Sequence, residues 1–105
     1  MRRNKYNNKK VVIDGFKFDS KAEGRRYEEL KSLERGKIIL DLELQPRFDF
    51  ELNGVKMGFY KADFRYHDME KGCIIIEDVK GMKTPVYNLK KKMMKAFHNI
   101  EIFET

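Results

Sequence analysis

Two acidic residues and a lysine stand where they could hold a metal ion and activate a water molecule. Asp78 and Lys80 lie two residues apart at the end of the apolar run Cys73-Ile74-Ile75-Ile76, so they would share one face of a strand. Asp63 lies in the preceding aromatic segment, and pairing of the two segments would bring it to the same end of a sheet. Carboxylates and an ammonium group in an apolar setting are costly unless something nearby uses them. This composition is typical of a Mg²⁺ site with a water-orienting or water-activating lysine.

The alternation of side chains along this strand leaves open whether Asp78 or Glu77 lies beside Asp63. If it is regular, one face carries Ile74, Ile76, Asp78 and Lys80, and the other carries Ile75, Glu77 and Val79. Glu77 would then point away from Asp63. A β-bulge at this point would exchange the roles of Glu77 and Asp78.

A third acid, Glu23, lies on an expected helix that Ser20 opens and Gly36 closes. Ser20-Lys21-Ala22-Glu23 is a capping box, in which the Glu23 carboxylate would bond back to the Ser20 backbone. Glu23 also begins an apolar stripe with Tyr27 and Leu30 that would face the sheet. The carboxylate could therefore serve the helix cap or reach the acidic end of the sheet.

Composition limits the class of protein. A chain of 105 residues is one domain of modest core, and its net charge of +6 suits a polyanionic partner. The single cysteine, Cys73, excludes a disulfide framework and favours a reducing cytoplasm. No apolar stretch is long enough to span a membrane or to act as a signal peptide.

The expected elements are those of a single α/β domain at residues 11–105, preceded by a flexible basic arm at residues 1–10. Asp14-Gly15 and Asn53-Gly54 predict tight turns. We expect a hairpin at 11–18, a helix at 20–35, strands at 37–44, 47–52, 55–66 and 73–80, a helix at 85–98 and a last strand at 100–103. The strand at 55–66 should bend near Gly58, with Ala62, Phe64 and Tyr66 on its core face and Lys61, Asp63 and Arg65 opposite. The second helix should bury Val86, Leu89 or Lys90, Met93 and Phe97, with Met94 beside them.

Basic and polar residues near the acidic end are candidates for DNA binding. They are Gln45, Lys61, Lys83, Tyr87, Lys90, Lys91, Lys92 and Lys95, together with Arg2, Arg3, Lys5, Lys9 and Lys10 of the arm. The alternative for the lysines is a solvated surface, and Gln45 could stand before Pro46 only for turn geometry. Arg25, Arg26 and Lys31 are expected on the solvated side of the first helix.

Asp63 followed by Asp78-Val79-Lys80 resembles the motif of the PD-(D/E)XK nuclease superfamily. Further matching segments are Phe18-Asp19-Ser20-Lys21-Ala22-Glu23, Leu44-Gln45-Pro46, Ala62-Asp63-Phe64 and Glu77-Asp78-Val79-Lys80-Gly81. They are similar to a family of small phage-borne proteins placed in that superfamily, and the resemblance covers nearly the whole chain. Ala62 stands where proline is the motif residue.

The resemblance implies a restriction-endonuclease-like αβββαβ core, with a mixed central sheet flanked by helices and an N-terminal hairpin. It implies Mg²⁺, with Mn²⁺ as a substitute, held by Asp63, Asp78 and the Val79 carbonyl, with Glu23 as a further candidate. Lys80 would orient or deprotonate the attacking water or stabilise developing charge. The implied activity is that of a phage DNA endonuclease on branched DNA, similar to Holliday junction resolvases, and the implied location is the cytoplasm of a bacterial host. We expect a homodimer because one small chain offers little surface for a junction. A nicking, repair-type or general DNA nuclease, or a DNA-binding module without catalysis, are the alternatives.

Overall fold

A computed structural model describes residues 10–79 and 83–105 of the chain. The elements run in the order β1 (Val11–Ile13), β2 (Phe16–Phe18), α1 (Lys21–Arg35), β3 (Ile39–Leu44), β4 (Arg47–Leu52), β5 (Val55–Lys61), β6 (Phe64–Asp68), β7 (Cys73–Asp78), α2 (Pro85–His98) and β8 (Phe103–Glu104). No helix in this part of the chain is long and apolar enough to cross a membrane.

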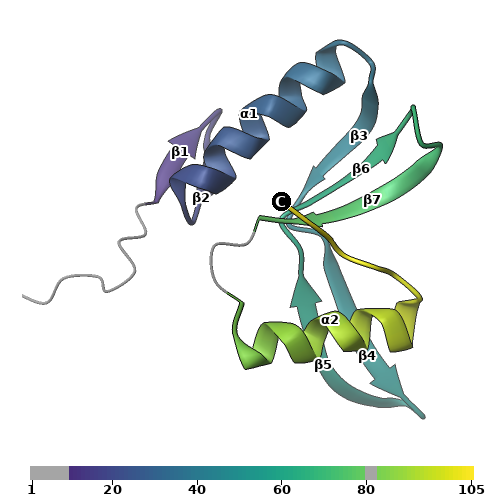
Figure 1. The fold of residues 1–105 in the computed structure, drawn as a ribbon. Coiled ribbons are helices and arrows are strands. Elements are labelled where there is room, and N and C mark those ends of the chain that lie inside the picture. Colours follow the sequence, from purple (N-terminus) through teal and green to yellow (C-terminus); the bar gives the residue numbers. More distant parts are fainter. Residues whose placement is uncertain (1–9, 80–82) are drawn as a thin grey trace, which may run out of the picture.

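The central element is a mixed four-stranded sheet with the strand order β3-β6-β7-β8. β7 pairs with β8 in parallel, and its pairing with β6 is antiparallel. Figure 1 shows α1 and α2 on opposite sides of these strands, with the β4–β5 hairpin beside α2. The expected α/β class, with a mixed sheet flanked by helices, is confirmed.

Side chains of β7 alternate between two cores that lie on opposite faces of the sheet. Ile75 and Val79 pack against the core beneath α1, which includes Tyr27 and Leu30. Ile76 belongs to the core beneath α2, with Met94. The pairing of β7 with β6 runs without a register shift. The strand is therefore regular, as its alternating pattern predicts, although it ends at Asp78 rather than at residue 80.

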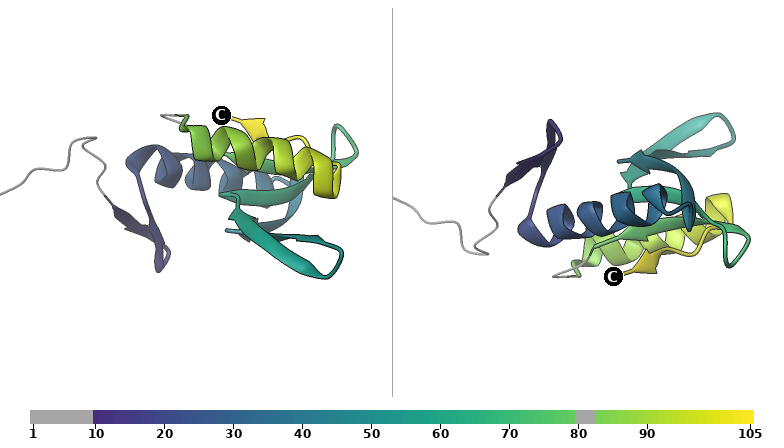
Figure 2. Two further views of the ribbon diagram at one scale, coloured as in Figure 1. Left: turned by 90° about the horizontal axis from the view of Figure 1, so that it is seen from below. Right: turned by 90° about the horizontal axis from the view of Figure 1, so that it is seen from above.

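The N-terminal hairpin packs on the first turns of α1 (Figure 2). Its turn residues Asp14 and Gly15 have φ angles of 55° and 81°, as the predicted turn requires. The Tyr27 hydroxyl donates to Asp14 Oδ2 at 2.8 Å. Gly24 permits the close approach, because a Cβ there would lie 2.8 Å from Cγ2 of Val11.

The expected single strand at 55–66 is wrong, because two strands of different sheets meet at Ala62–Asp63. Hydrogen bonds join this break to Gln45–Pro46: Gln45 N donates to Asp63 O at 3.0 Å, and Ala62 N donates to Pro46 O at 3.1 Å. Both chain segments change sheets at this point. Ala62 consequently belongs to the α2 core, whereas Phe64 and Tyr66 belong to the α1 core, so their expected common face is also wrong.

The bend near Gly58 is confirmed. The register of β4 with β5 shifts between Phe50 and Glu51, opposite Gly58, whose φ of 138° favours glycine. The other tight turn is confirmed as well, because Asn53 and Gly54 both have positive φ angles.

The bounds of α2 agree with the prediction, and its buried face agrees in part, because Met94 is buried and Met93 and Phe97 pack against the same core. Thr84 caps the helix and Pro85 occupies its first turn. Val86 and Leu89 are 62% and 57% exposed, whereas Tyr87 and Met94 are buried. Tyr87 packs against Tyr60 and fixes the rotation of the helix. The last strand is likewise displaced to Phe103–Glu104, because Ile100 and Ile102 pack into the α2 core instead.

Candidate functional site

Asp63 is bonded to the residues on both sides of Asp78. Its backbone N–H donates to the Glu77 carbonyl at 3.1 Å, and its Oδ2 accepts from the Val79 N–H at 2.7 Å. These bonds fix the break between β5 and β6 against the end of β7. Asp78 is 2% exposed. The structure therefore brings together the two aspartates that the sequence singles out, at one end of the sheet.

The Glu23 carboxyl belongs to the same acidic cluster. Its pKa is raised to about 7, first by burial and then by the charges of Asp63, Asp19 and Asp78. A backbone hydrogen bond at Asp19 works in the opposite direction. Ser20 Oγ accepts from the Glu23 N–H at 3.1 Å, so the cap exists while the carboxyl lies among the acids. Glu23, Tyr27 and Leu30 are all buried, which confirms the predicted stripe.

Carboxylate oxygens and a backbone carbonyl are the donors that Mg²⁺ prefers, and Mg²⁺ is usually bound by one or two carboxylates with waters and substrate phosphates. Within residues 10–79 and 83–105, no group of three or more His, Cys, Asp or Glu side chains is arranged to hold a metal ion. Asp63 and Asp78, with the backbone carbonyl of Val79 next in the sequence, fit a site in which only two carboxylates bind the ion. The raised pKa of Glu23 also fits, because a cation would offset the negative charge that raises it.

Glu77 lies on the other face of β7 in a separate network. The side chain is fully buried, and Arg26 binds it through Nε at 2.6 Å and Nη2 at 3.0 Å. The hydroxyls of Tyr66 and Thr105 donate to it at 2.6 and 3.0 Å. Because β7 is regular, Glu77 does not replace Asp78 beside Asp63. The solvated position expected for Arg26 is wrong, since the buried carboxylate holds its guanidinium group.

A second polar cluster, centred on Glu104, adjoins the aspartates. Glu104 accepts from the Tyr87 hydroxyl at 2.6 Å and pairs with Lys83 at 3.0 Å and with Lys91 at 3.2 Å. These contacts lower the pKa of Glu104 to about 2. The pKa of Tyr87 is raised by burial, then by Glu104, and further by Asp78 and Asp63. Tyr87 thus lies between the two clusters, where the sequence predicts a residue that reaches the site.

The other candidate DNA-binding residues occupy varied positions. Gln45 and Lys61 are exposed beside the strand break, and Gln45 has a left-handed φ of 52°. The ammonium of Lys90 lies 5.2 Å from the centre of the Phe59 ring, Lys95 pairs with Glu101 at 3.4 Å, and Lys10 and Lys92 are exposed. Lys80, Arg2, Arg3, Lys5 and Lys9 lie outside the described residues.

Sequence reasoning missed Asp19, Arg26 and Glu104. A signal existed for Arg26, which follows Glu23 by three residues and so belongs to the face that carries the buried stripe. For Glu104 no signal existed, because its contacts depend on the parallel pairing of β8 with the end of β7.

Comparisons with known proteins give one match. The family model described as "Protein of unknown function (DUF1064)" matches residues 3–103. No curated protein and no solved structure matches the chain.

Proposed function

The chain belongs to the DUF1064 family, whose description names no activity, and we propose that it is a metal-dependent DNA endonuclease. The observation that carries the proposal is the bonding of Asp63 to both neighbours of Asp78, next to the buried Glu23. Acids gathered in this way repel one another, and an arrangement of this kind is a candidate functional site. The net charge of +6 supports a polyanionic substrate.

The residues of the cluster would have distinct roles. Asp63, Asp78 and the Val79 carbonyl would hold Mg²⁺ or Mn²⁺, with Glu23 adjoining them. When bound, such an ion neutralises phosphate charge and lowers the pKa of a bound water. Lys80 follows Asp78 by two residues and would orient or deprotonate the attacking water or stabilise developing charge. Tyr87 and Lys91 would contact the substrate beside the cluster.

The element order supports a restriction-endonuclease-like core as part of the proposal. Without the β4–β5 hairpin, the sequence from α1 through β3, β6, β7 and α2 to β8 is αβββαβ. The acids lie at the end of β7 and at the break that precedes β6. Asp63 and Asp78, which lie at these two positions, are the acids of the motif that resembles that of PD-(D/E)XK nucleases.

Branched DNA is the proposed substrate, and a homodimer is the proposed active form. The described part of one chain contains one acidic cluster, whereas resolution of a four-way junction requires cuts in two strands. A nicking, repair-type or general DNA nuclease would use the same cluster on other DNA structures. A binding module without catalysis would use the lysines alone.

The decisive experiment incubates the protein with a labelled four-way junction, a matched linear duplex and a single strand. Each reaction contains Mg²⁺, Mn²⁺ or EDTA. Paired metal-dependent cuts in the junction alone are expected. Equal cutting of the duplex would make the protein a general nuclease, and binding without cutting under every metal would identify a binding module.

Single substitutions test which residues of the acidic cluster take part in cleavage. Asp63→Asn, Asp78→Asn and Lys80→Ala should each abolish cleavage and retain DNA binding. Asp41→Asn is the matched control, because Asp41 is exposed and its left-handed φ of 57° is one that asparagine accepts. A variant that cuts at the wild-type rate removes its residue from the site.

A further inference from the structure

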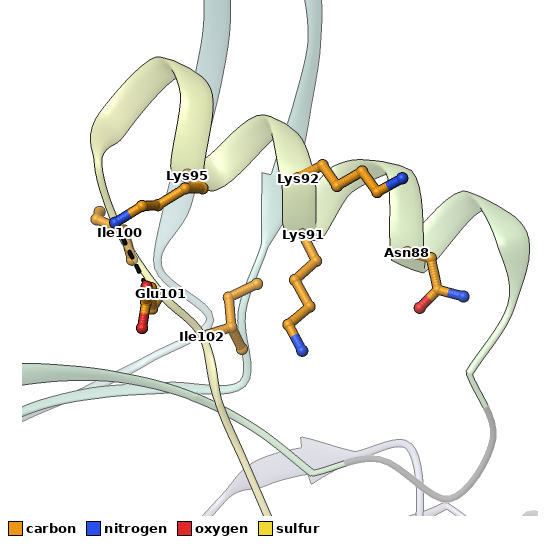
Figure 3. A pocket seen from close by; sticks show the side chains of 7 residues that line it. All are labelled: Asn88, Lys91, Lys92, Lys95, Ile100, Glu101 and Ile102. Carbon is orange, nitrogen blue, oxygen red and sulfur yellow. Dashed lines mark ion pairs between the residues drawn. The ribbon is translucent and has the colours of Figure 1, made fainter.

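A groove runs along α2 beside the segment that leads to β8, and it is lined with lysines. Its volume is about 630 Å³, within the range of binding sites for small ligands. Figure 3 shows the side chains of Asn88, Lys91, Lys92 and Lys95 on the helix and those of Ile100, Glu101 and Ile102 opposite. An ammonium-rich wall facing an apolar wall suits a ligand with both anionic and apolar parts.

The groove carries more cation charge than its own acid can neutralise. Lys95 pairs with Glu101 at 3.4 Å, and Glu101 is 81% exposed, so this pair is weak and screened. Lys92 makes no ion pair within the described part of the chain. Lys91 is shared with Glu104 at 3.2 Å. An anionic ligand could therefore bind these lysines without breaking a buried ion pair.

The groove is also connected to the acidic cluster. Lys91 lines it and pairs with Glu104, which accepts the hydroxyl of Tyr87 at 2.6 Å. Tyr87 is near enough to Asp63 and Asp78 for their charges to act on its hydroxyl. Direct contacts thus lead from the groove to Glu104, which is the strand partner of Asp78 in the pairing of β7 with β8.

We propose that this groove binds the phosphate and sugar groups of one DNA strand, immediately beside the bond that Asp63 and Asp78 would act on. The position of that bond rests on the proposed function, whereas binding in the groove does not. Repeating phosphates match the row of lysines, and sugar carbons match the partly exposed Ile100. A groove of this volume admits a single strand or one strand of an opened duplex.

Binding of a fluorescent oligothymidylate of about 12 nucleotides tests the proposal, in EDTA so that no cleavage occurs. Lys92→Ala/Lys95→Ala should weaken binding roughly tenfold at 0.1 M salt and should reduce the slope of log K against log[salt] by about 1.4. Glu101→Gln should tighten binding roughly threefold, because it removes the acid that competes for Lys95.

Lys17→Ala/Lys56→Ala is the matched control, since both lysines are exposed and lie on other elements. It should change the affinity by less than about twofold. Equal losses in both double variants would overturn the proposal in favour of bulk charge, and so would wild-type affinity in Lys92→Ala/Lys95→Ala. Equally tight groove-dependent binding of polyglutamate would identify an acidic peptide as the ligand and would also overturn it.

Two results would separate DNA binding in the groove from DNA cleavage at the acidic cluster. Cleavage of DNA together with unchanged binding by the lysine variants would remove the groove and leave the nuclease. Loss of binding by those variants, in a protein that cuts nothing under any metal, would leave the groove as a site for a DNA strand.

Discussion

At the scale of residues, five buried or partly buried acids lie near one end of the sheet, and their neighbours give them different properties. Glu77 is bound by a guanidinium group and two hydroxyls. Glu104 is stabilised as a carboxylate by a tyrosine and two lysines. Glu23 instead has burial and three aspartates acting against its charge. Asp78, buried beside Glu23, is held next to Asp63 by backbone geometry.

Glu23 should make the protein less stable as the pH rises. The folded-state pKa of about 7 exceeds the ordinary value of 4.5, so the folded state binds more protons than the unfolded state between these values. The contribution of Glu23 to the free energy of unfolding therefore falls as pH rises from 4.5 to 7. Glu23→Gln should remove this dependence and stabilise the protein at pH 8, relative to pH 5, by on the order of 1–3 kcal/mol.

Urea denaturation of both proteins at pH 5 and pH 8, without divalent metal, measures this difference. Glu28→Gln, on the exposed side of the same helix, serves as the control. The same pH dependence in wild type and Glu23→Gln would contradict the assignment.

Arg26 should be worth more to stability than any exposed arginine of the chain. Arg26→Ala would leave the carboxylate of Glu77 buried without its cation, which typically costs about 3–5 kcal/mol. Arg25→Ala, at the exposed neighbouring position, should change stability by about 0.5 kcal/mol or less. Chemical denaturation compares them. The double variant Arg26→Met/Glu77→Met should recover part of the loss, and an Arg26→Ala protein as stable as Arg25→Ala would refute the role of the pair.

At the scale of elements, the C-terminal strand connects the sheet to the start of α2. β8 pairs with Glu77 and Asp78, Thr105 N donates to the Asp78 carbonyl at 3.0 Å, and Glu104 binds Lys83, Tyr87 and Lys91. The end of β7 that carries Asp78 is therefore held between β6 on one side and β8 on the other. The Glu104 carboxylate also connects β8 to α2 through Tyr87 and Lys91.

Glu104→Gln should lower the melting temperature at neutral pH and have a smaller effect in acid. Because its folded-state pKa is lowered to about 2, Glu104 stabilises the fold above pH 4.5, and this contribution is lost as the pH falls toward 2. Thermal unfolding of wild type and Glu104→Gln between pH 7 and pH 3 gives the comparison, with Glu101→Gln as an exposed control. A gap between the melting curves that stays constant down to pH 3 would contradict the prediction.

Local patterns in the sequence predicted most helices and strands, but they did not predict the sheets to which the strands belong. Turn dipeptides, the Ser20 and Thr84 caps and the alternation of β7 predicted the hairpins, both helices and the central strand. The break at Ala62–Asp63 has no local signal, because an apolar run reads the same whether it stays in one sheet or crosses to another. The rotation of α2 was also missed, since Val86 and Tyr87 are both apolar and only contact with Tyr60 and Glu104 decides between them.

The residues of the candidate site could likewise be predicted from the sequence only in part. Asp63, Asp78 and Glu23 could be proposed from residue type, spacing and the resemblance of the motifs, and the structure brings all three together. Arg26 and Glu104 bind partners 51 and 17 residues away in the sequence, and no local pattern encodes such a pairing. Helical spacing could have placed Arg26 on the buried face, but its partner and the role of Glu104 became visible only with the fold.

At the scale of the whole molecule, residues 10–79 and 83–105 of one chain form one acidic cluster and one lysine-lined groove. Hydrolysis at one cluster cuts one strand, so resolution of a junction within a single encounter requires two copies. If the active form is a homodimer, mixing wild type with Asp78→Asn should produce dimers with one working cluster. These dimers should nick a supercoiled plasmid that bears a cruciform, whereas wild-type dimers should linearise it.

An equimolar mixture should therefore yield linear product at about one quarter of the wild-type amount and accumulate nicked circles, because one dimer in four carries two wild-type chains when subunits pair at random. Gel electrophoresis measures both products, and sedimentation establishes the mass of the free protein. Mixing with Asp41→Asn, which retains the cluster, should leave linearisation unchanged. If wild type itself releases nicked circles before linear product, and the mixture forms them at about half that rate, each chain acts independently, and the active form is a monomer that cuts the two strands in separate encounters.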